Sequence, residues 1–494
     1  MSGFNPNLLF FLDRLQGFSC NTYMLIPQNK NTATASDIIT VDLPSNALNN
    51  FNSFAMHCNA QCVDSSNELN ARMPPIADFF ERIEVSVGGL ILSQGTNFQN
   101  VLIEAKKALI EDYAFDSVLS HPEYVRHTSY VDGCNISSGH PEAYIPGTNG
   151  LPTGETLFCV KFSECFLGTV HPTYFDCSLI PDIKVRIYCA SNNILTTSAT
   201  QTLGIASGDF ADQSTTSTTS GPGAPASTLT GATYQLTDIV FTIECFSLAD
   251  GTYDNLIASQ MNQQGFLEVP YKAYQTFQNT HTGTSNFSVS CASLDRIWLA
   301  WRSSDYNQQQ TPITVEGHKV QGAFVLTAAS GGSEYDIGVS TYDSGSVAGL
   351  DLNSEKYESR YFNFCEPCLY TNPPYAYGGF KLQIQLNGAY IPNFQATGSQ
   401  MYAISRNSLP LNTRAKRMTR RQYLKNNFVQ CIRLNMPDSE YTYTLSGLDT
   451  RSSNLAGSVV SNGISGSLNP NLTIFVESTE VLRIGSGKSI EAVS

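Results

Sequence analysis

Residues 81–92, ERIEVSVGGLIL, carry the pattern that decides the fold. Ile83, Val85 and Val87 alternate with polar residues, which is the period of a strand with one buried face. Gly88-Gly89 follows, and glycine accepts the positive φ values that a two-residue hairpin turn requires. Apolar residues resume directly after the glycines. The stretch therefore predicts a β-hairpin.

A second stretch near the other end of the chain has the same design. Residues 381–391 read KLQIQLNGAYI, in which Leu382, Ile384 and Leu386 alternate with polar residues before the turn pair Asn387-Gly388. The two stretches keep the same phase, turn length and final glycine. This recurrence favours one β-domain used twice.

The ends of the two halves support a duplication. Residues 238–246, DIVFTIECF, and residues 471–481, NLTIFVESTEV, are both alternating strands, and each closes one half of the chain. The alternative is one large antiparallel protein in which hairpins resemble one another through composition alone.

The bulk composition bounds the class of protein. A chain of 494 residues is too long for one core and fits two β-domains of about 200–250 residues each. Charged residues make up 14% and aromatic residues 11%, and Ser, Thr, Asn, Gln and Gly fill the stretches between apolar runs. This composition is typical of strand-rich proteins with long ordered loops. The net charge of −14 argues against a surface that binds a nucleic-acid backbone.

The N-terminus and the cysteines indicate a reducing compartment. The first residues have no basic leading region, and the apolar run from Leu8 to Leu12 is too short for a signal core or a membrane span. We therefore expect a protein that is not secreted. The thirteen cysteines are scattered and odd in number, and we interpret them as reduced core residues. Those inside apolar strands are Cys58, Cys159, Cys189, Cys245, Cys291 and Cys431.

Short strands with regular turn signals predict an all-β chain of two tandem eight-stranded antiparallel jelly rolls, with a few short helices and long loops. We expect one helix from Asn97, with an apolar face that plugs an open end of a sandwich, and a second over 413–425. The predicted division is an arm (1–30), a first jelly roll (31–250), a linker (251–265), a second jelly roll (266–484) and a tail (485–494).

Motifs for chemistry are weak throughout the chain. Residues 485–489, GSGKS, resemble the end of a phosphate-binding loop, but position 482 is Leu and too few residues follow for the required helix. The pair Cys365 and Cys368 has the spacing of half a zinc site, without a second pair at a suitable interval. No pattern selects a carboxylate pair or a histidine ligand set. We therefore expect no enzyme activity and no catalytic, cofactor-binding or metal site.

The basic run at 414–425 leaves two interpretations open. It suits nucleic acid or an anionic membrane, and against the overall negative charge it equally suits a helix that pairs with an acidic neighbouring subunit, which we favour. The glycosylation sequons at Asn135, Asn286 and Asn471 are interpreted as chance matches, because no secretory signal accompanies them.

The order of these features resembles the double-jelly-roll major capsid proteins of double-stranded DNA viruses. The resemblance is carried by ARMPPIADFFERIEVSVGGLIL (71–92), by FKLQIQLNGAYIP (380–392) and by the long insertion in the second half. It is greatest to the virophage and polinton-like type, with the large nucleocytoplasmic DNA viruses as a near alternative. No single motif is diagnostic, and the order of the motifs carries the likeness.

The resemblance implies a structural role. Such proteins form homotrimers whose six jelly rolls make a pseudo-hexagonal capsomer of an icosahedral virion, made in the host cytoplasm or nucleus. It implies contacts with neighbouring capsomers and with penton and minor capsid proteins, and no sequence-specific nucleic-acid binding. Residues 196–231 and 304–378 would form outward towers. The arm and the tail would lie on the inner side, where the arm would meet any inner membrane.

A second class of function is a cellular jelly-roll protein that binds or hydrolyses carbohydrate. Its sequence support is a pair of tryptophans, Trp298 and Trp301, which would stack on sugar rings. Their spacing of three within one strand places them on opposite faces, so at least one belongs to the core.

Overall fold

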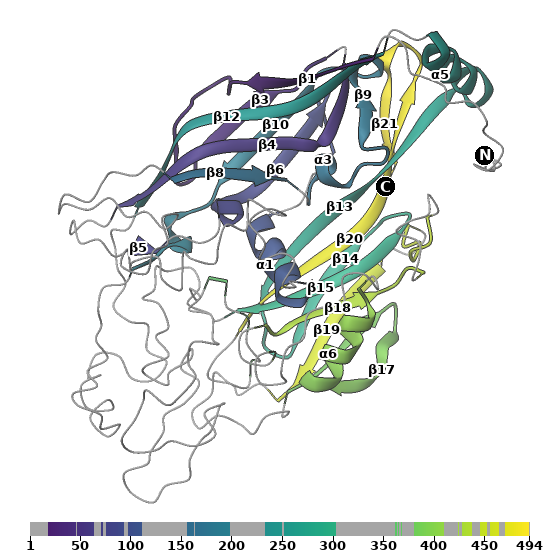
Figure 1. Ribbon diagram of the computed structural model, residues 1–494. Helices are drawn as coiled ribbons and strands as arrows, with labels where there is room; N and C mark the ends of the chain where they lie inside the picture. Colours follow the sequence, from purple (N-terminus) through teal and green to yellow (C-terminus); the bar gives the residue numbers. More distant parts are fainter. Residues whose placement is uncertain are drawn as a thin grey trace, which may run out of the picture.

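The structure of the protein is a computed structural model that describes part of the chain. The described residues are 18–45, 47–63, 71–72, 76–92, 97–110, 156–162, 164–197, 233–248, 251–302, 361–362, 364, 367, 380–409, 423, 427–436, 445–451, 455–463 and 470–493. Within these ranges the chain is mostly antiparallel strand, and it forms two halves that lie side by side (Figure 1). The predicted all-β class is confirmed.

The first half is a sandwich of two sheets. One sheet has the order β1-β12-β4-β8, with β2 and β9 as short additions, and the other has the order β3-β10-β6-β7. A separate two-stranded ladder joins β5 and β11. The bounds are β1 Phe18–Leu25, β2 Ala33–Thr34, β3 Ile38–Asp42, β4 Leu48–Val63, β5 Ala71–Arg72, β6 Phe80–Val87, β7 Leu90–Ile91, β8 Thr156–Lys161, β9 Tyr174–Asp176, β10 Ile183–Cys189, β11 Thr196–Thr197 and β12 Thr233–Leu248.

The second half repeats this sandwich. Its sheets have the orders β13-β20-β15-β18, to which β21 is added, and β14-β19-β16-β17. The bounds are β13 Phe266–Thr280, β14 Thr284–Val289, β15 Leu294–Arg302, β16 Lys381–Leu386, β17 Ala389–Thr397, β18 Val429–Arg433, β19 Leu455–Asn462, β20 Asn471–Gly485 and β21 Ile490–Val493.

The strand order confirms the predicted duplication. When the eight principal strands of either half are numbered along the chain, each half has a sheet 1-8-3-6 facing a sheet 2-7-4-5. This interleaved antiparallel order is that of a jelly roll. The last strand, β12 or β20, lies next to the first strand in each half, so the two closing runs seen in the sequence are structural equivalents.

Both hairpins form as the sequence predicts. Gly88 and Gly89 turn between β6 and β7 with φ of 54° and 92°, and Asn387 and Gly388 turn between β16 and β17 with φ of 48° and 83°. The alternating apolar residues Ile83, Val85 and Val87 are at most 1% exposed. The alternation therefore marks the face that packs into the core.

Four α-helices are described: α1 Gln99–Ile110, α3 Phe166–Thr169, α5 Gly251–Gln264 and α6 Gly398–Asn407. Short 3-10 turns are η2 Ile76–Phe79, η5 Cys177–Leu179, η6 Asn192–Ile194 and η13 Ser486–Lys488. The helix expected after Asn97 is confirmed as α1. It does not close an open end, because it lies where the two halves meet (Figure 1) and contacts β6 of the first half and β15 and β18 of the second.

Three predicted segments have more structure than expected. Phe18–Leu25, within the expected arm, pairs along its whole length with β12, and residues 251–264 of the expected linker form α5. Residues 490–493 of the expected tail form β21 on β20, and Ile490 lies near Gly88 of the first half. The strand β1 was not recognised in the sequence because few apolar residues alternate with its polar ones. The helix α5 was not recognised because its sequence is only weakly amphipathic.

Other expectations lie outside the described residues. Apart from Tyr423, this holds for the helix expected over 413–425 and its basic run, and it holds for the arm residues 1–17. The segments expected to form towers, 196–231 and 304–378, are described only at 196–197, 361–362, 364 and 367. The cysteine interpretation is tested at eight positions, which are free thiols, and seven of these are buried.

Gly457 in β19 provides a test of the second core. A Cβ added there would lie 2.3 Å from the Phe287 ring, at a backbone conformation that any residue adopts. We expect Gly457→Ala to lower the free energy of unfolding by about 1–3 kcal/mol through overpacking. Urea unfolding measures the loss. In a Phe287→Leu background the same substitution should cost clearly less, and an equal cost in both backgrounds would contradict the predicted clash.

His281 predicts an acid-sensitive core in the second half. Its ring is fully buried between the hydroxyls of Ser285 and Ser461, each at 2.7 Å, and meets Trp301 edge-on. Burial lowers the pKa of His281 from 6.5 to about 4. As the pH falls, His281 is therefore protonated in the unfolded chain before it is protonated in the folded one. The contribution of neutral, buried His281 to the stability is fully present above pH 6.5 and is lost as the pH falls toward 4.

We expect the shift at His281 to remove roughly 3 kcal/mol of unfolding free energy over this window. Urea unfolding at several pH values measures the slope. His281→Gln keeps a polar side chain that does not titrate and should flatten it. An unchanged slope in His281→Gln would contradict the prediction.

Candidate functional site

No group of three or more His, Cys, Asp or Glu is placed to hold a metal ion in the described part of the chain. The Cys365 and Cys368 pair lies outside it. Among the described helices none is long and apolar enough to cross a membrane. Residues 485–489, the sequence expected to be unrelated to phosphate binding, form the end of β20 and the 3-10 turn η13.

Both tryptophans are buried. Trp298 is 1% exposed and donates from its indole Nε1 to Glu477 at 3.0 Å, and Trp301 is 0% exposed and donates to Gln430 at 2.6 Å. The two side chains lie on opposite faces of the sheet, as predicted. Trp301 packs on Phe380 in the sandwich core, whereas Trp298 faces the first half. Neither ring is available to stack on a sugar.

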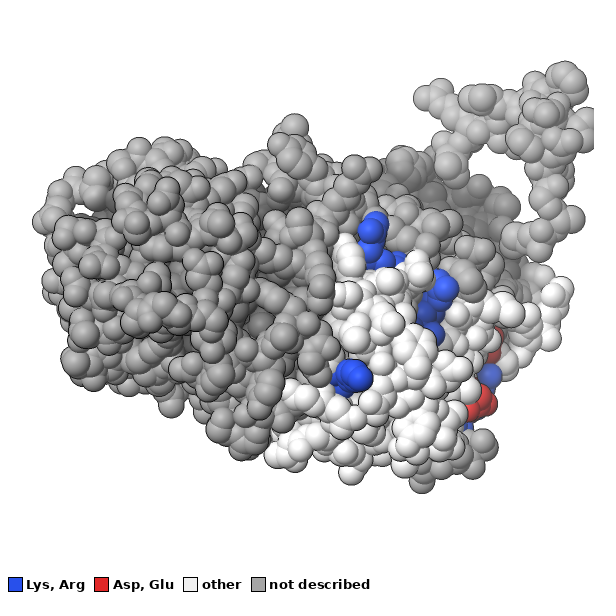
Figure 2. Space-filling model, turned by 90° about the horizontal axis from the view of Figure 1, so that it is seen from below, with Lys and Arg blue, Asp and Glu red and all other residues white. Residues whose placement is uncertain are grey.

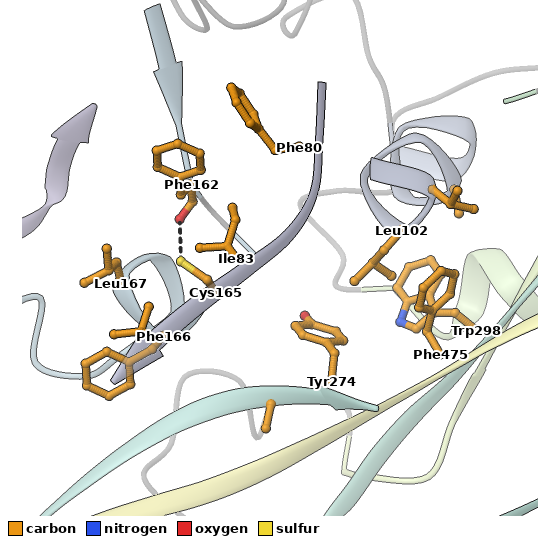
Figure 3. Close-up of a cluster of buried hydrophobic side chains, with 14 of the residues drawn as sticks. Phe80, Ile83, Leu102, Phe162, Cys165, Phe166, Leu167, Tyr274, Trp298 and Phe475 are labelled. Atoms are coloured by element: carbon orange, nitrogen blue, oxygen red, sulfur yellow. Dashed lines mark hydrogen bonds between the residues drawn. The ribbon is translucent and has the colours of Figure 1, made fainter. Parts of the chain in front are cut away.

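The junction between the halves is built on a continuous apolar layer. Figure 3 shows Leu102 of α1 above Trp298 and Phe475, which lie on the outer face of the second half's β13-β20-β15-β18 sheet. Phe166 of α3 meets Tyr271 of β13 edge-on, with the ring centroids 5.1 Å apart. Because these side chains are 2% exposed or less, the first half covers this sheet tightly.

An ionic cluster, partly buried at Lys106 and Glu164, accompanies the apolar layer. Lys106 of α1 forms an ion pair with Glu164 and donates to the Tyr274 hydroxyl at 2.7 Å. The same ammonium lies 4.6 Å from the centre of the Tyr274 ring. Lys106 and Glu164 belong to the first half and Tyr274 to the second, so these contacts fix the halves relative to one another.

Glu477 of β20 is the centre of this cluster. It accepts from Arg296 at 2.8 Å as well as from Trp298, and it is 3% exposed. Burial alone would raise its pKa, but the positive charges of Arg296, Lys106 and Lys272 hold the pKa of Glu477 at about 2. The carboxylate is therefore a fixed negative charge in the interface between the halves.

Hydrogen bonds with Thr169 and His171 of the first half also cover the free edge of β13. The Lys272 amide donates to Thr169 Oγ1 at 3.1 Å, and the His171 amide donates to the Pro270 carbonyl at 3.0 Å. An uncovered strand edge pairs readily with other chains, so these bonds with the end of α3 and the residues after it protect β13.

A groove of about 1140 Å³ runs along this junction, between the segment around α3, α5 and the ends of β13 and β20. Five of its lining side chains are Lys or Arg and five are Asp or Glu. Several form ion pairs within the groove, including Lys272 with Asp295 at 2.6 Å. The balanced lining gives the groove no preference for a ligand of either charge.

The corresponding sheet of the first half has an exposed outer face. Met24 on β1 is 65% exposed and Tyr174 on β9 is 51% exposed, and Tyr174 packs edge-on against Phe246 of β12. Glu244 lies between them and accepts from Cys20 Sγ at 3.1 Å and from Asn50 at 2.9 Å. We call this surface the β1 face. It consists of Cys20, Thr22, Met24, Asn50, Tyr174, Thr242, Glu244 and Phe246.

The other sheets of the two halves differ in charge. In the first half, Glu84 accepts from Arg186 at 2.6 Å and from Arg82 at 3.2 Å across β6 and β10. In the second half, Lys381 is the single charged residue in β14, β19, β16 and β17. Figure 2 shows the underside of the molecule, where α6 and β17 lie; the described part of this surface is mostly uncharged, with separate Lys and Arg side chains and with Asp or Glu at one edge. Depletion of charge is typical of the centre of protein interfaces.

Solved structures of virus capsid proteins match the chain over nearly its full length. The crystal structure of VP54 from PBCV-1, fitted into a reconstruction of the virophage Sputnik, has a TM-score of 0.52 and 11% sequence identity, and the match covers 99% of each chain. A quasi-atomic description of the PBCV-1 capsid has a TM-score of 0.50, with the same identity and coverage. No protein-family profile and no curated protein matches the chain.

The chain has the double jelly-roll fold of a virus capsid protein. The match extends through both halves, so the chain shares with these structures the whole pair of jelly rolls and not one jelly roll only. Sequence reasoning found the two halves but did not find the residues that join them. Lys106, Glu164 and Tyr274 are far apart in the chain, and only the polar character of Lys106 on an apolar helix face hinted at a buried partner.

Proposed function

We propose that the chain is the major capsid protein of a double-stranded DNA virus and forms the trimeric capsomers of an icosahedral shell. The double jelly-roll fold, matched over 99% of the chain, carries the proposal. The virion shell is the location that this role implies. We infer that the chain acts through its surfaces and not as an enzyme, without a catalytic, cofactor or metal site.

The joined halves support this role. Because the apolar layer and the Lys106–Glu164–Tyr274 cluster hold the two jelly rolls together, one chain offers two similar sandwiches in a fixed arrangement. Three such chains would supply six sandwiches for a pseudo-hexagonal unit. The division at 31–250 and 266–484 remains our proposal for the domains, with the first starting earlier, at β1.

The carbohydrate-binding alternative has less support. It depended on exposed tryptophan rings, and both rings are buried with their Nε1 groups hydrogen-bonded. The junction groove has a balanced ionic lining, and neither tryptophan lines it.

The finer partners follow from the same proposal. We propose contacts with neighbouring capsomers and with penton and minor capsid proteins, and no sequence-specific binding of nucleic acid. The net charge of −14 supports the last point and keeps the free subunit soluble. The basic run at 414–425 is proposed to pair with an acidic neighbouring subunit.

Electron microscopy of the purified protein tests the proposed function. The expected result is a population of triangular or pseudo-hexagonal particles that convert to closed shells when the salt concentration is raised or when minor capsid proteins are added. Particles that stay monomeric under all these conditions, together with binding in a glycan screen, would favour the alternative.

The N-terminal residues provide a separate prediction. Leu9, Phe10 and Phe11 lie in the expected arm, outside the described residues. Replacing all three with Ser should leave the trimer folded and reduce shell formation, because the apolar side chains are proposed to bridge capsomers or to meet an inner membrane. Light scattering of the assembly reaction measures the reduction. Loss of the trimer itself would contradict the assignment of these residues to a bridging arm.

A further inference from the structure

The duplication makes each half an internal reference for the other. Glu244 of β12 pairs with Thr22 of β1 and Asn50 of β4, and Glu477 of β20 pairs with Tyr274 of β13 and Arg296 of β15. Both carboxylates therefore lie on the last strand of the same jelly-roll sheet, between its first and third strands and on its outer face. The β1 face belongs to the β1-β12-β4-β8 sheet of the first half. Its counterpart in the second half is the outer face of the β13-β20-β15-β18 sheet, which the first half covers.

The two counterparts differ in what covers them. Glu477 is 3% exposed beneath α1, with Lys106 as one of the charges that lower its pKa. Glu244 is only half-buried, and its carboxylate accepts hydrogen bonds from the neutral groups of Cys20 and Asn50. The equivalent sheet therefore has a covering layer in the second half and an open surface in the first.

We propose that the second half of another copy of this chain covers the β1 face, in the same way that the first half covers the second within one chain. The proposal rests on the capsomer function, and it names the surface through which one subunit binds the next. Such a contact is head-to-tail, joining different surfaces of the two copies, and it closes into a ring when the rotation between copies allows.

Charge favours a second copy as the occupant. In chain order α6 is the second half's counterpart of α1, since each helix follows the strand pair β16–β17 or β6–β7. The single charged side chain of α6 is Arg406, in its last turn, and the single charged side chain of the β1 face is Glu244. Arg406 and Glu244 would then correspond to Lys106 and Glu477.

Apolar surface also matches on the two sides. Met24 and Tyr174 are more than half exposed on the β1 face, although large apolar side chains gain free energy when buried. In the first half, the segment after β8 contains Phe166, which packs on β13. The corresponding segment after β18 begins with Leu434–Met436, and Met436 is 69% exposed. Each surface therefore has an apolar side chain for the other.

Cysteine labelling tests the proposal directly. Cys20 lies on the β1 face and is exposed, whereas the other free thiols of the described residues are buried. A short pulse of a maleimide, followed by peptide mass spectrometry, reports the labelling rate of Cys20 alone. We expect labelling at least about tenfold slower in the oligomer than in protein diluted until it is monomeric.

A pair of matched substitutions accompanies the labelling. Met24→Glu on the β1 face should dissociate the oligomer and restore fast labelling of Cys20, with an unchanged circular dichroism spectrum. Ile38→Glu places the same charge on β3, at a side chain that is 38% exposed on the other sheet, and should leave the oligomer intact.

The outcomes separate this inference from the proposed function. A stable trimer in which Cys20 reacts as fast as in the monomer, or a trimer that survives Met24→Glu, would overturn the β1 face as the contact and leave the capsomer role standing. A wild-type chain that never associates would overturn the capsomer role itself, and with it this contact.

Discussion

Replacement of Arg296 with Met is expected to lower the free energy of unfolding by about 3–5 kcal/mol, because it leaves the Glu477 carboxylate buried without its closest charged partner. The two side chains are 8% and 3% exposed, so water cannot compensate for the loss. Urea unfolding at pH 7 measures the change.

The pH dependence of this variant follows from Glu477. With a folded pKa of about 2 against 4.5 in the unfolded chain, the wild-type carboxylate stabilises the fold above pH 4.5, and this stabilisation is lost as the pH falls toward 2. Without Arg296 we expect the pKa of Glu477 to rise. The difference between the variant and wild type should therefore shrink as the solution becomes more acidic.

Two controls make the Arg296 prediction specific. Arg451 and Asp449 form an ion pair of the same 2.8 Å length, but both side chains are 51% exposed, so Arg451→Met should leave the unfolding midpoint unchanged. The double variant Arg296→Met/Glu477→Met removes both charges and should recover much of the stability. A double variant as unstable as Arg296→Met would show that packing, and not the unpaired carboxylate, causes the loss.

Phe166→Ala is expected to cost about 3–5 kcal/mol and to loosen the two halves from one another. The ring is fully buried and contacts Phe51 and Phe175 in the first half and Tyr271 in the second. Its removal therefore creates a cavity at the point where the sandwiches join. Hydrogen exchange should increase along β13, which the end of α3 and the residues after it cover in the wild type.

Tyr174→Ala is the matched control for Phe166→Ala. Tyr174 is also an aromatic residue of the first half, but it is 51% exposed and contacts Phe246 at the surface. Its removal should leave both the unfolding midpoint of the monomer and the exchange along β13 unchanged. Faster exchange confined to the first half in Phe166→Ala would contradict the role of Phe166 in joining the halves.

The fold was largely predictable because local patterns define it. The alternation at Ile83, Val85 and Val87 and the turn pair Asn387-Gly388 are short-range signals, and they specify strands and turns without knowledge of the partners. The duplication was visible because equivalent strands keep equivalent patterns. The interleaved strand order agrees with the class of fold that these patterns indicated.

Elements with weaker patterns were missed. In β13 the alternation of Leu267, Val269 and Tyr271 contains a Pro, which obscured a strand of 15 residues. The helix α6 begins with a capping box between Thr397 and Gln400, a signal that was present in the sequence but is weak beside the many polar residues around it.

The junction could not be predicted from the sequence. Arg296 and Glu477 are separated by 181 residues, and the pairing of β15 with β20 alone brings them together. The same holds for the β1 face, since its exposure is recognised only by comparison with the covered counterpart in the second half. Long-range pairing therefore defines the surfaces on which the proposed function depends.

The mass of the purified wild-type protein in solution tests the central claim most directly. Light scattering coupled to size-exclusion chromatography should give a stable species near three times the 53.9 kDa mass of the chain. A species that remains at the mass of one chain, at all concentrations and salt conditions tested, would contradict the capsomer role.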